Sequence, residues 1–352
     1  ANAAYAITIN TNDAANEVTA ANLNRINSAT TGTINANVVT ELKASDLTDL
    51  TTFHSNRGDF SNTGNIATIN LTDNGGAGTS VDYSTLETIV DNYRAAGADG
   101  INENAVFKFA NADAITIDDA DEVTAYVADI TSGALALTNQ TVTVDSTVNL
   151  GVTDARKIAN DTSGTVTATI ASSRVSDLTT LYNPGDGNET NAWTITLHTN
   201  DATAATAAEL NTIDSATSVD VTSAAITGLA ASDLDDLTTL NGNAGNFSTL
   251  ANITAVTLTE NGGAGNTNVD YSTLETIIDA YQARNGAVAF TPDAGDTIVI
   301  DDADEVTAYV SDITNGRLVL ADQAVTVDSS VNLSITDARK IANDTSGTVT
   351  AT

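Results

Sequence analysis

Two short acidic runs contain the residues whose types and spacing come closest to a binding site. Each run places four carboxylates within five consecutive positions. They are Asp118, Asp119, Asp121 and Glu122 in the first run and Asp301, Asp302, Asp304 and Glu305 in the second. Calcium is a hard cation that takes roughly six to eight oxygen ligands, and closely spaced carboxylates supply such ligands. One chemistry that these runs favour is therefore the binding of Ca²⁺.

The same carboxylates also have a structural interpretation. The first run directly precedes apolar residues at helical spacing, which are Val123, Tyr126, Val127 and Ile130. Asp and Glu in the first turn of a helix cap its free backbone N–H groups and interact favourably with the helix dipole. Neither run has the glycine and the final glutamate of an EF-hand loop. We therefore favour helix capping, with Ca²⁺ as the alternative and no other cofactor expected.

The sequence does not indicate a catalytic centre. The chain has no Cys, which excludes disulfides, thiolate metal sites and cysteine nucleophiles. His54 lies near Ser55 and Asp59, which are the residue types of a hydrolase triad. The position that corresponds to His54 in the second half of the chain is Asn241, and His198 stands at a different point. We therefore predict that the protein is not an enzyme.

The charge of the chain restricts its partners. Twelve Lys and Arg residues stand against 46 Asp and Glu residues, which gives a net charge of −34 over 352 residues. Nucleic acids and anionic membrane surfaces attract clustered basic residues, so neither is expected as a partner. No stretch approaches the roughly 20 apolar residues of a membrane-spanning helix, so we expect no membrane insertion.

The sequence is a tandem repeat. Residues 153–169 and 336–352 both read TDARKIANDTSGTVTAT, and other segments recur with few changes. We assign repeat A to residues 1–187 and repeat B, a shortened copy, to residues 188–352. Both repeats start or stop inside a strand pattern, so we expect the sequence to be a segment of a longer array.

A shorter alternation of strand and helix patterns lies inside each repeat. Runs that alternate apolar residues with Thr are typical of strands with one buried face, and they include residues 6–10, 33–39, 66–72, 114–118, 141–145 and 165–171. Short helical patterns follow these runs. Capping-box spacing marks two helix starts, Ser84 with Glu87 and Thr206 with Glu209.

Glycine marks the expected helix ends. Five glycines each close a helical stretch just before a strand, and they are Gly32, Gly133, Gly164, Gly316 and Gly347. We predict a left-handed backbone conformation at each, because that conformation ends many helices and suits glycine.

These elements predict an α/β fold with parallel strands and helical crossovers. One cycle of strand, turn and helix spans about 20–35 residues, which is too short to enclose a core, whereas stacked cycles bury a continuous one. We therefore favour an elongated repeat solenoid with a parallel sheet on one side and short helices on the other. A string of compact α/β repeat domains is the alternative. Trp193, which corresponds to Tyr5 of repeat A, is expected to fill a junction between layers.

Two segments resemble a known class of repeats. Residues 162–181, TSGTVTATIASSRVSDLTTL, and residues 118–133, DDADEVTAYVADITSG, are similar to repeats of giant secreted and cell-surface proteins of marine cyanobacteria. The resemblance implies secretion, a location at the cell surface and no catalytic residues. One such protein is linked to swimming motility, and others carry calcium-binding or secretion modules elsewhere in the chain.

The sequence thus predicts a structural, non-catalytic extracellular protein that forms a filament, a surface layer or a surface fibre. Its expected partner is itself, through end-to-end or lateral assembly. The main alternative is the stalk of a calcium-dependent adhesin. A repeat-scaffold polysaccharide lyase and an ice-binding face of aligned Thr residues are weaker alternatives, because a recurring catalytic set is missing and the cycle lengths are uneven.

Overall fold

The protein is an α/β protein with parallel sheets. The computed structural model describes residues 4–10, 18–72, 80–96, 101–109, 114–182, 191–259 and 268–351. The chain forms two compact units. Unit 1 comprises Ala1–Ala171 and Asn183–Trp193, and unit 2 comprises Ser172–Tyr182 and Thr194–Thr352. The sequence boundary at residue 187 lies outside the described residues.

The described part of unit 1 contains three sheets of parallel strands. The first has the order β1 (Ile7–Thr8), β2 (Ile34–Asn35), β4 (Phe60–Ser61). The second has the order β3 (Glu41–Ser45), β5 (Thr68–Leu71), β7 (Val106–Phe109), β9 (Leu135–Ala136). The third has the order β11 (Asn149–Leu150), β12 (Val166–Ile170), β10 (Thr141–Val144), β8 (Ala114–Ile117), β6 (Ser80–Asp82), and β13 (Ala192–Thr194) also pairs with β12.

Among its described residues, unit 2 repeats this design with two sheets. One has the order β14 (Gly228–Ser232), β15 (Ala255–Leu258), β17 (Ala289–Thr291), and the other β16 (Asn268–Asp270), β18 (Thr297–Ile300), β19 (Ala324–Val327), β20 (Val349–Thr350). Paired strands lie one coil apart in the sequence, where a coil is one cycle of strand, turn and helix. The prediction of parallel strands is confirmed. The strands of one coil enter different sheets, so each unit contains more than one parallel sheet.

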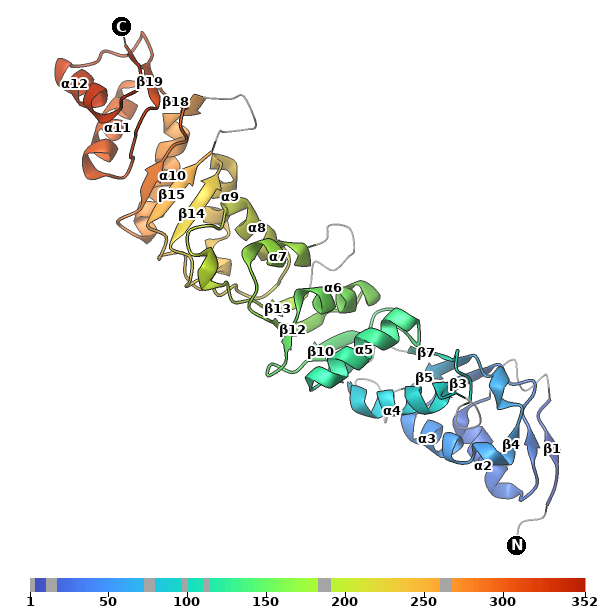
Figure 1. Cartoon of the computed structure of the whole chain (residues 1–352). Coiled ribbons are helices and arrows are strands. Elements are labelled where there is room, and N and C mark those ends of the chain that lie inside the picture. The colour runs from blue at the N-terminus through green and yellow to red at the C-terminus, as the bar shows by residue number, and fades with distance from the viewer. Residues whose placement is uncertain are drawn as a thin grey trace. The chain divides into compact units, whose positions relative to one another are not determined.

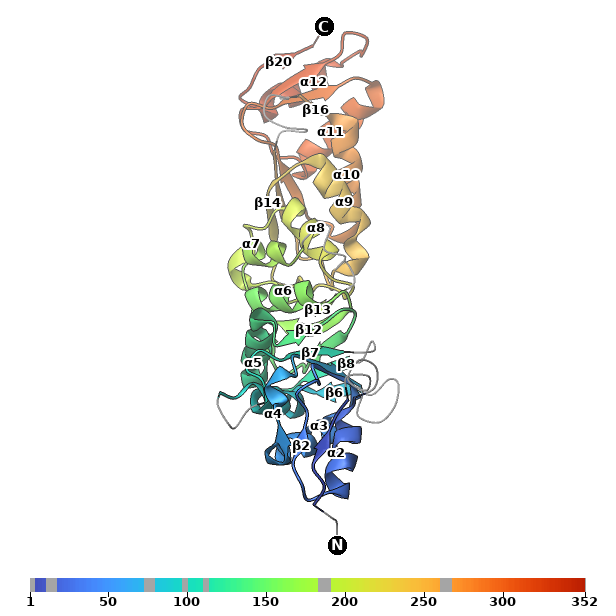
Figure 2. The ribbon, with the colours of Figure 1, turned by 90° about the vertical axis from the view of Figure 1, so that its right-hand side faces the viewer.

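One helix of each coil packs against the helix of the next. In unit 1 these helices are α2 (Ala20–Ala29), α3 (Leu47–Ser55), α4 (Tyr83–Arg94), α5 (Ala120–Ser132) and α6 (Val152–Asp161). In unit 2 they are α7 (Val175–Leu178), α8 (Ala207–Ser215), α9 (Leu234–Gly242), α10 (Tyr271–Arg284), α11 (Ala303–Asn315) and α12 (Ile335–Asp344). Within each unit the helices can be followed in chain order in Figures 1 and 2.

The core of each coil lies between its helix and its strands. In α4 the residues Leu86, Ile89, Val90 and Tyr93 share one face and are buried, as their helical spacing predicts. Tyr93 packs edge-on against Phe107 of the following strand β7, with ring centroids 5.6 Å apart. The apolar residues are therefore buried both within a coil and between neighbouring coils.

Buried side chains also join successive coils by hydrogen bonds. The Oγ of Ser45 accepts the backbone N–H of Ala20, the first residue of α2, at 2.9 Å, and donates to the Lys43 carbonyl at 2.8 Å. Ser232 makes the same two bonds, accepting from Ala207 of α8 at 2.9 Å. Each serine lies 25 residues after its donor. The first N–H of these helices thus depends on a side chain of the next coil.

Two of the five glycine predictions are right. Gly133 and Gly316 end α5 and α11 with φ of 71° and 69°, in the left-handed conformation. The prediction is wrong for Gly32, Gly164 and Gly347, which have no positive φ. At each of these three, a Cβ would overlap backbone atoms of the preceding coil. Here glycine is required by the close approach of two backbones and not by its conformational freedom.

The start of α4 also differs from the prediction. Asp82 caps this helix by accepting the N–H of Thr85, and Ser84 lies inside the helix and donates to Asp82. By contrast, Thr206 and Glu209 form the predicted capping box at the start of α8. Asp82, and not Ser84, caps α4 because its carboxylate stands one residue before the helix, where it can accept the N–H of Thr85.

We predict that Gly164→Ala destabilises the protein by about 1–3 kcal/mol, as expected for overpacking a tight contact. The added methyl group would overlap the Gln140 carbonyl oxygen. Gly242→Ala at the end of α9 is the control, because a Cβ there meets open space. Urea denaturation measures both variants. Equal stability of the two variants would contradict the proposed close approach.

Candidate functional site

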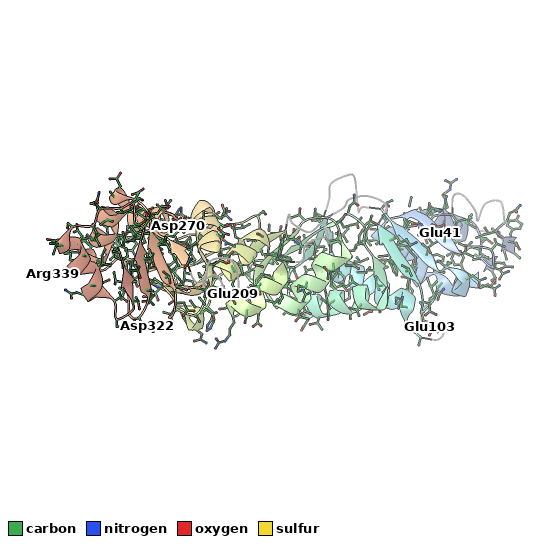
Figure 3. The ribbon with its side chains drawn as sticks, turned by 90° about the horizontal axis from the view of Figure 1, so that it is seen from above. Glu41, Glu103, Glu209, Asp270, Asp322 and Arg339 are labelled. Atoms are coloured by element: carbon green, nitrogen blue, oxygen red, sulfur yellow. The ribbon has the colours of Figure 1, made fainter. Side chains whose placement is uncertain are left out.

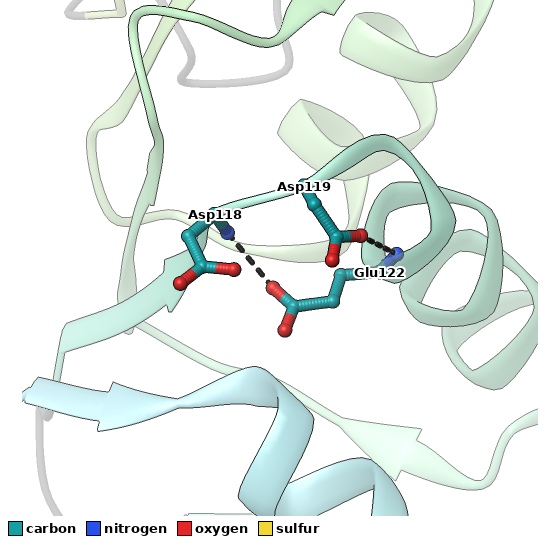
Figure 4. A group of neighbouring side chains, drawn as sticks. All are labelled: Asp118, Asp119 and Glu122. Carbon is teal, nitrogen blue, oxygen red and sulfur yellow. Dashed lines mark hydrogen bonds between the residues drawn. The ribbon is translucent and has the colours of Figure 1, made fainter.

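The first acidic run lies where β8 ends and α5 begins. The carboxylates of Asp118, Asp119 and Glu122 gather there, with one oxygen of each within 4.8 Å of the others. We call these three residues the first acidic group, which Figure 4 shows. Asp118 and Asp119 are exposed, whereas Glu122 is buried. The sequence run thus becomes a compact group because a tight turn brings its members together.

Two of the three carboxylates cap the backbone of this turn. Asp119 precedes α5 in an extended conformation, and its Oδ1 accepts the N–H of Glu122 at 2.8 Å. The Oε2 of Glu122 in turn accepts the N–H of Asp118 at 2.8 Å. The carboxylate of Asp118 takes part in neither bond. Asp119 and Glu122 therefore accept backbone N–H groups on both sides of the helix start.

Repeat B reproduces this arrangement. Asp301, Asp302 and Glu305 form the second acidic group, also with oxygens within 4.8 Å. Glu305 accepts from the N–H of Asp301 at 2.7 Å and donates its own N–H to Asp302 at 2.8 Å. Asp121 and Asp304 belong to neither group. The structure therefore brings together three of the four predicted residues in each run.

Burial and like charges make the buried glutamates harder to ionise. Burial raises the pKa of Glu122, the negative charges of Asp118 and Asp119 raise it further, and the hydrogen bond from the Asp118 N–H opposes these effects. Burial raises the pKa of Glu305 in the same way. A positive charge beside either group would relieve the repulsion among its carboxylates.

The donor set can serve as a cap and contribute to a cation site. Carboxylate oxygens are suitable ligands for Ca²⁺, and each group offers three carboxyl groups where Ca²⁺ takes roughly six to eight oxygens. The partial positive charge at the start of α5 stabilises the negative charge of these carboxylates even without a cation. The carboxylates of Asp119 and Glu122 each accept a backbone N–H, so both have a structural role without a metal. The geometry therefore fits the capping interpretation.

The two histidines have separate structural surroundings. The ring of His54 stacks on Tyr93 with centroids 5.8 Å apart. Its sequence neighbours are bonded elsewhere, since Ser55 donates to the Thr51 carbonyl and Asp59 accepts from Asn27. The Nδ1 of His198 accepts the N–H of Asn200 at 3.0 Å. These contacts give His54, Ser55 and Asp59 each a local role.

Two tyrosine–carboxylate pairs between helices are not predictable from local sequence patterns. The hydroxyl of Tyr83 in α4 donates to Asp129 in α5 at 2.7 Å, and Tyr271 in α10 donates to Asp312 in α11 at the same distance. Burial raises the pKa of both aspartates, although the bond from tyrosine opposes this effect. The only sequence signal was the recurrence of these residues in both repeats.

The chain matches no family model and no curated protein. Among the described residues, no helix is sufficiently long and apolar to cross a membrane.

We predict that Asp119→Ala lowers the free energy of unfolding by about 1 kcal/mol, because the N–H of Glu122 loses its cap. Asp121→Ala removes the same charge from the same helix turn without removing either capping bond. Chemical denaturation of both variants measures the difference. If Asp121→Ala costs as much as Asp119→Ala, the group is not a cap.

We also predict that stability rises as the pH falls from 7 to about 5. The raised pKa values of Asp129 and Asp312 mean that the folded protein binds protons at a higher pH than the unfolded chain. Their contribution is complete below the ordinary carboxyl pKa of about 4 and is lost as the pH rises through the raised values. Urea midpoints measured across this pH range test the sign.

The matched control for this prediction is a pair of double variants. Asp129→Asn with Asp312→Asn keeps an oxygen that can accept from tyrosine but cannot titrate, so the pH dependence should flatten. The other double variant, Asp121→Asn with Asp304→Asn, removes two charges outside both tyrosine pairs and should keep the dependence. Stability that falls steadily from pH 7 to 5 in the parent protein would contradict the prediction.

Proposed function

We propose that the chain is a structural, non-catalytic extracellular protein that forms a filament, a surface layer or a surface fibre. The observation that carries this proposal is the repeated bond between coils, in which Ser45 and Ser232 each hold the first helical N–H of the preceding coil. A stack whose coils hold one another in this way is suited to extension and to bearing load along the chain.

The polar residues support the proposal through their local roles. Asp46, Asp82, Asp233 and Asp270 each accept a backbone N–H at the start of a helix. Other charged side chains, such as Glu103, Asp322 and Arg339, are exposed (Figure 3). A large negative charge keeps a repetitive protein soluble.

The extracellular location rests on the resemblance to secreted cyanobacterial repeats and on a composition without Cys. An elongated solenoid in which the coils continue without interruption belongs to the same proposal. A string of compact domains is its alternative. The first design resists bending, whereas the second bends wherever two domains meet.

Electron microscopy of the purified protein tests the proposal. We expect narrow rods of uniform width, and no turnover of anionic polysaccharides in a parallel assay. Round, compact particles or measurable turnover would contradict the structural role. Rods that bend at one fixed point would support the string of domains.

A calcium-dependent stalk is the second candidate, and the two acidic groups favour it. It predicts that millimolar Ca²⁺ raises the melting temperature more than Na⁺ does at matched ionic strength, because simple screening depends only on ionic strength. Equal effects of the two ions would exclude specific sites.

One pair of variants separates a calcium site from general charge effects. Asp118→Asn with Asp301→Asn removes one carboxylate from each group and keeps both capping bonds, which use only the backbone of these residues. This variant should lose the calcium response. Asp121→Asn with Asp304→Asn removes the same charge outside both groups and should retain it.

A further inference from the structure

The helix pair α4 and α5 of repeat A shares one framework with the helix pair α10 and α11 of repeat B. Tyr83 donates to Asp129 at 2.7 Å, and Tyr271 donates to Asp312 at the same distance. The second helix of each pair ends at a glycine with a left-handed backbone conformation. The residue after that glycine donates its N–H to the carbonyl of the same aspartate at 2.9 Å in both repeats. Its side chain therefore leaves the backbone at the same place in each repeat.

In repeat B the residue after the glycine is Arg317, whose guanidinium lies between two carboxylates. Its Nη1 is 3.5 Å from the Oδ1 of Asp312 in α11 and 4.0 Å from the Oδ1 of Asp279 in α10. The side chain of Asp312 is only 5% exposed. Burial raises the pKa of Asp312, and the charge of Arg317 opposes this effect. Repeat B thus pairs carboxylates of two neighbouring helices with a cation of its own.

Repeat A keeps the two carboxylates but has another residue in place of the cation. The counterparts of the two aspartates are Asp91 and Asp129, and the counterpart of Arg317 is Ala134. In the part of the chain that the structure describes, no basic side chain lies within 4.0 Å of either carboxylate. The same pair of acidic residues therefore stands in repeat A without the arginine that accompanies it in repeat B.

The carboxylate of Asp129 is accessible and carries an electrostatic cost. It is half-buried, whereas its counterpart Asp312 is buried. Burial raises the pKa of Asp129, and the negative charge of Asp91 raises it further. The charge of Arg94 opposes this rise, but the Nη1 of Arg94 donates to the Ala105 carbonyl at 2.6 Å. A cation from outside the chain would therefore stabilise the ionised form of Asp129.

The contacts in repeat B indicate which cation fits. Calcium lies roughly 2.3–2.6 Å from about six to eight oxygens, whereas the Nη1 of Arg317 lies 3.5 and 4.0 Å from two of them. One oxygen of Asp129 already accepts the hydroxyl of Tyr83. A guanidinium is planar and has several N–H donors in a fixed plane, so it can contact carboxylates of two helices at once. The compact ammonium of lysine is a point charge and lacks this geometry.

We propose that Asp91 and Asp129 of repeat A bind the guanidinium group of an arginine side chain from a partner protein, in the position that Arg317 occupies in repeat B. Glu87 of α4 adds negative charge beside this site, since the charges of Asp91 and Asp129 raise its pKa in addition to burial. A negative surface attracts a basic partner over a distance. All of these residues belong to unit 1, so the site does not depend on whether the chain forms a fibre.

Titration of the isotope-labelled 352-residue protein, followed by NMR, tests the site. The probes are a blocked tripeptide with a central arginine, the same peptide with lysine, and CaCl₂, all at matched ionic strength so that screening is equal. We expect saturable shifts of the N–H signals of Asp91 and Asp129 with the arginine peptide. The lysine peptide should cause smaller shifts, and CaCl₂ should cause none that saturate at these two residues.

Two reciprocal variants separate this site from general charge effects. Ala134→Arg supplies the guanidinium from within repeat A and should abolish the saturable shifts. Arg317→Ala removes it from repeat B and should create a second set of shifts at Asp279 and Asp312. Val219→Arg is the matched control for Ala134→Arg, because it adds the same charge at an exposed residue of unit 2 and should retain binding. Circular dichroism confirms that each variant folds like the parent protein.

Three results would overturn the inference: no saturable response to the arginine peptide, an equal or larger response to the lysine peptide or to CaCl₂, or an Ala134→Arg variant that retains the shifts. Narrow rods in electron microscopy without the arginine response would refute the site and leave the structural function intact. Round particles that turn over polysaccharide but show the arginine response would support the site and refute the proposed function.

Discussion

The fold depends on hydrogen bonds that leave one coil and end in the next. A helix start leaves backbone N–H groups without partners inside the helix, and burying them unpaired is costly. Here the first N–H of α2 and of α8 is accepted by a serine 25 residues later, and that of α7 by the carboxylate of Asp201 at 3.0 Å. The first N–H of each of these three helices therefore has its acceptor only when the next coil is in place.

This dependence explains several other features of the chain. The backbones of successive coils approach so closely that Gly164 has no space for a side chain. Thr162 uses this proximity, because its hydroxyl donates to the Gln140 carbonyl of the preceding coil at 2.6 Å and accepts the N–H of Gly164 at 3.0 Å. Thin layers that meet at short distances favour small apolar residues, which the composition supplies with 4% aromatic residues and no Met.

Local patterns predicted the elements well, because period-two and helical spacing report which face of a segment is buried. The helix with Val123, Tyr126 and Val127 on its buried face and the capping box of Thr206 and Glu209 follow directly from spacing. The acidic runs were placed correctly at helix starts. Contacts between coils were not predictable, since nothing local relates Ser45 to Ala20 or Tyr83 to Asp129. The role of each glycine was not predictable for the same reason. Glycine is required both by a left-handed backbone conformation and by the close approach of two backbones, and the sequence does not distinguish the two.

The exchange rate of the Ala207 N–H, together with the stability of unit 2, tests most directly whether contacts between coils hold the structure. Ser232→Ala removes the bond to this N–H from the next coil. Ser215→Ala is the control, because its hydroxyl bonds the Asn211 carbonyl within one helix. We predict that Ser232→Ala speeds exchange at Ala207 and lowers the free energy of unfolding by about 1–3 kcal/mol, with a smaller loss for Ser215→Ala. An equal or larger loss for Ser215→Ala would contradict the account.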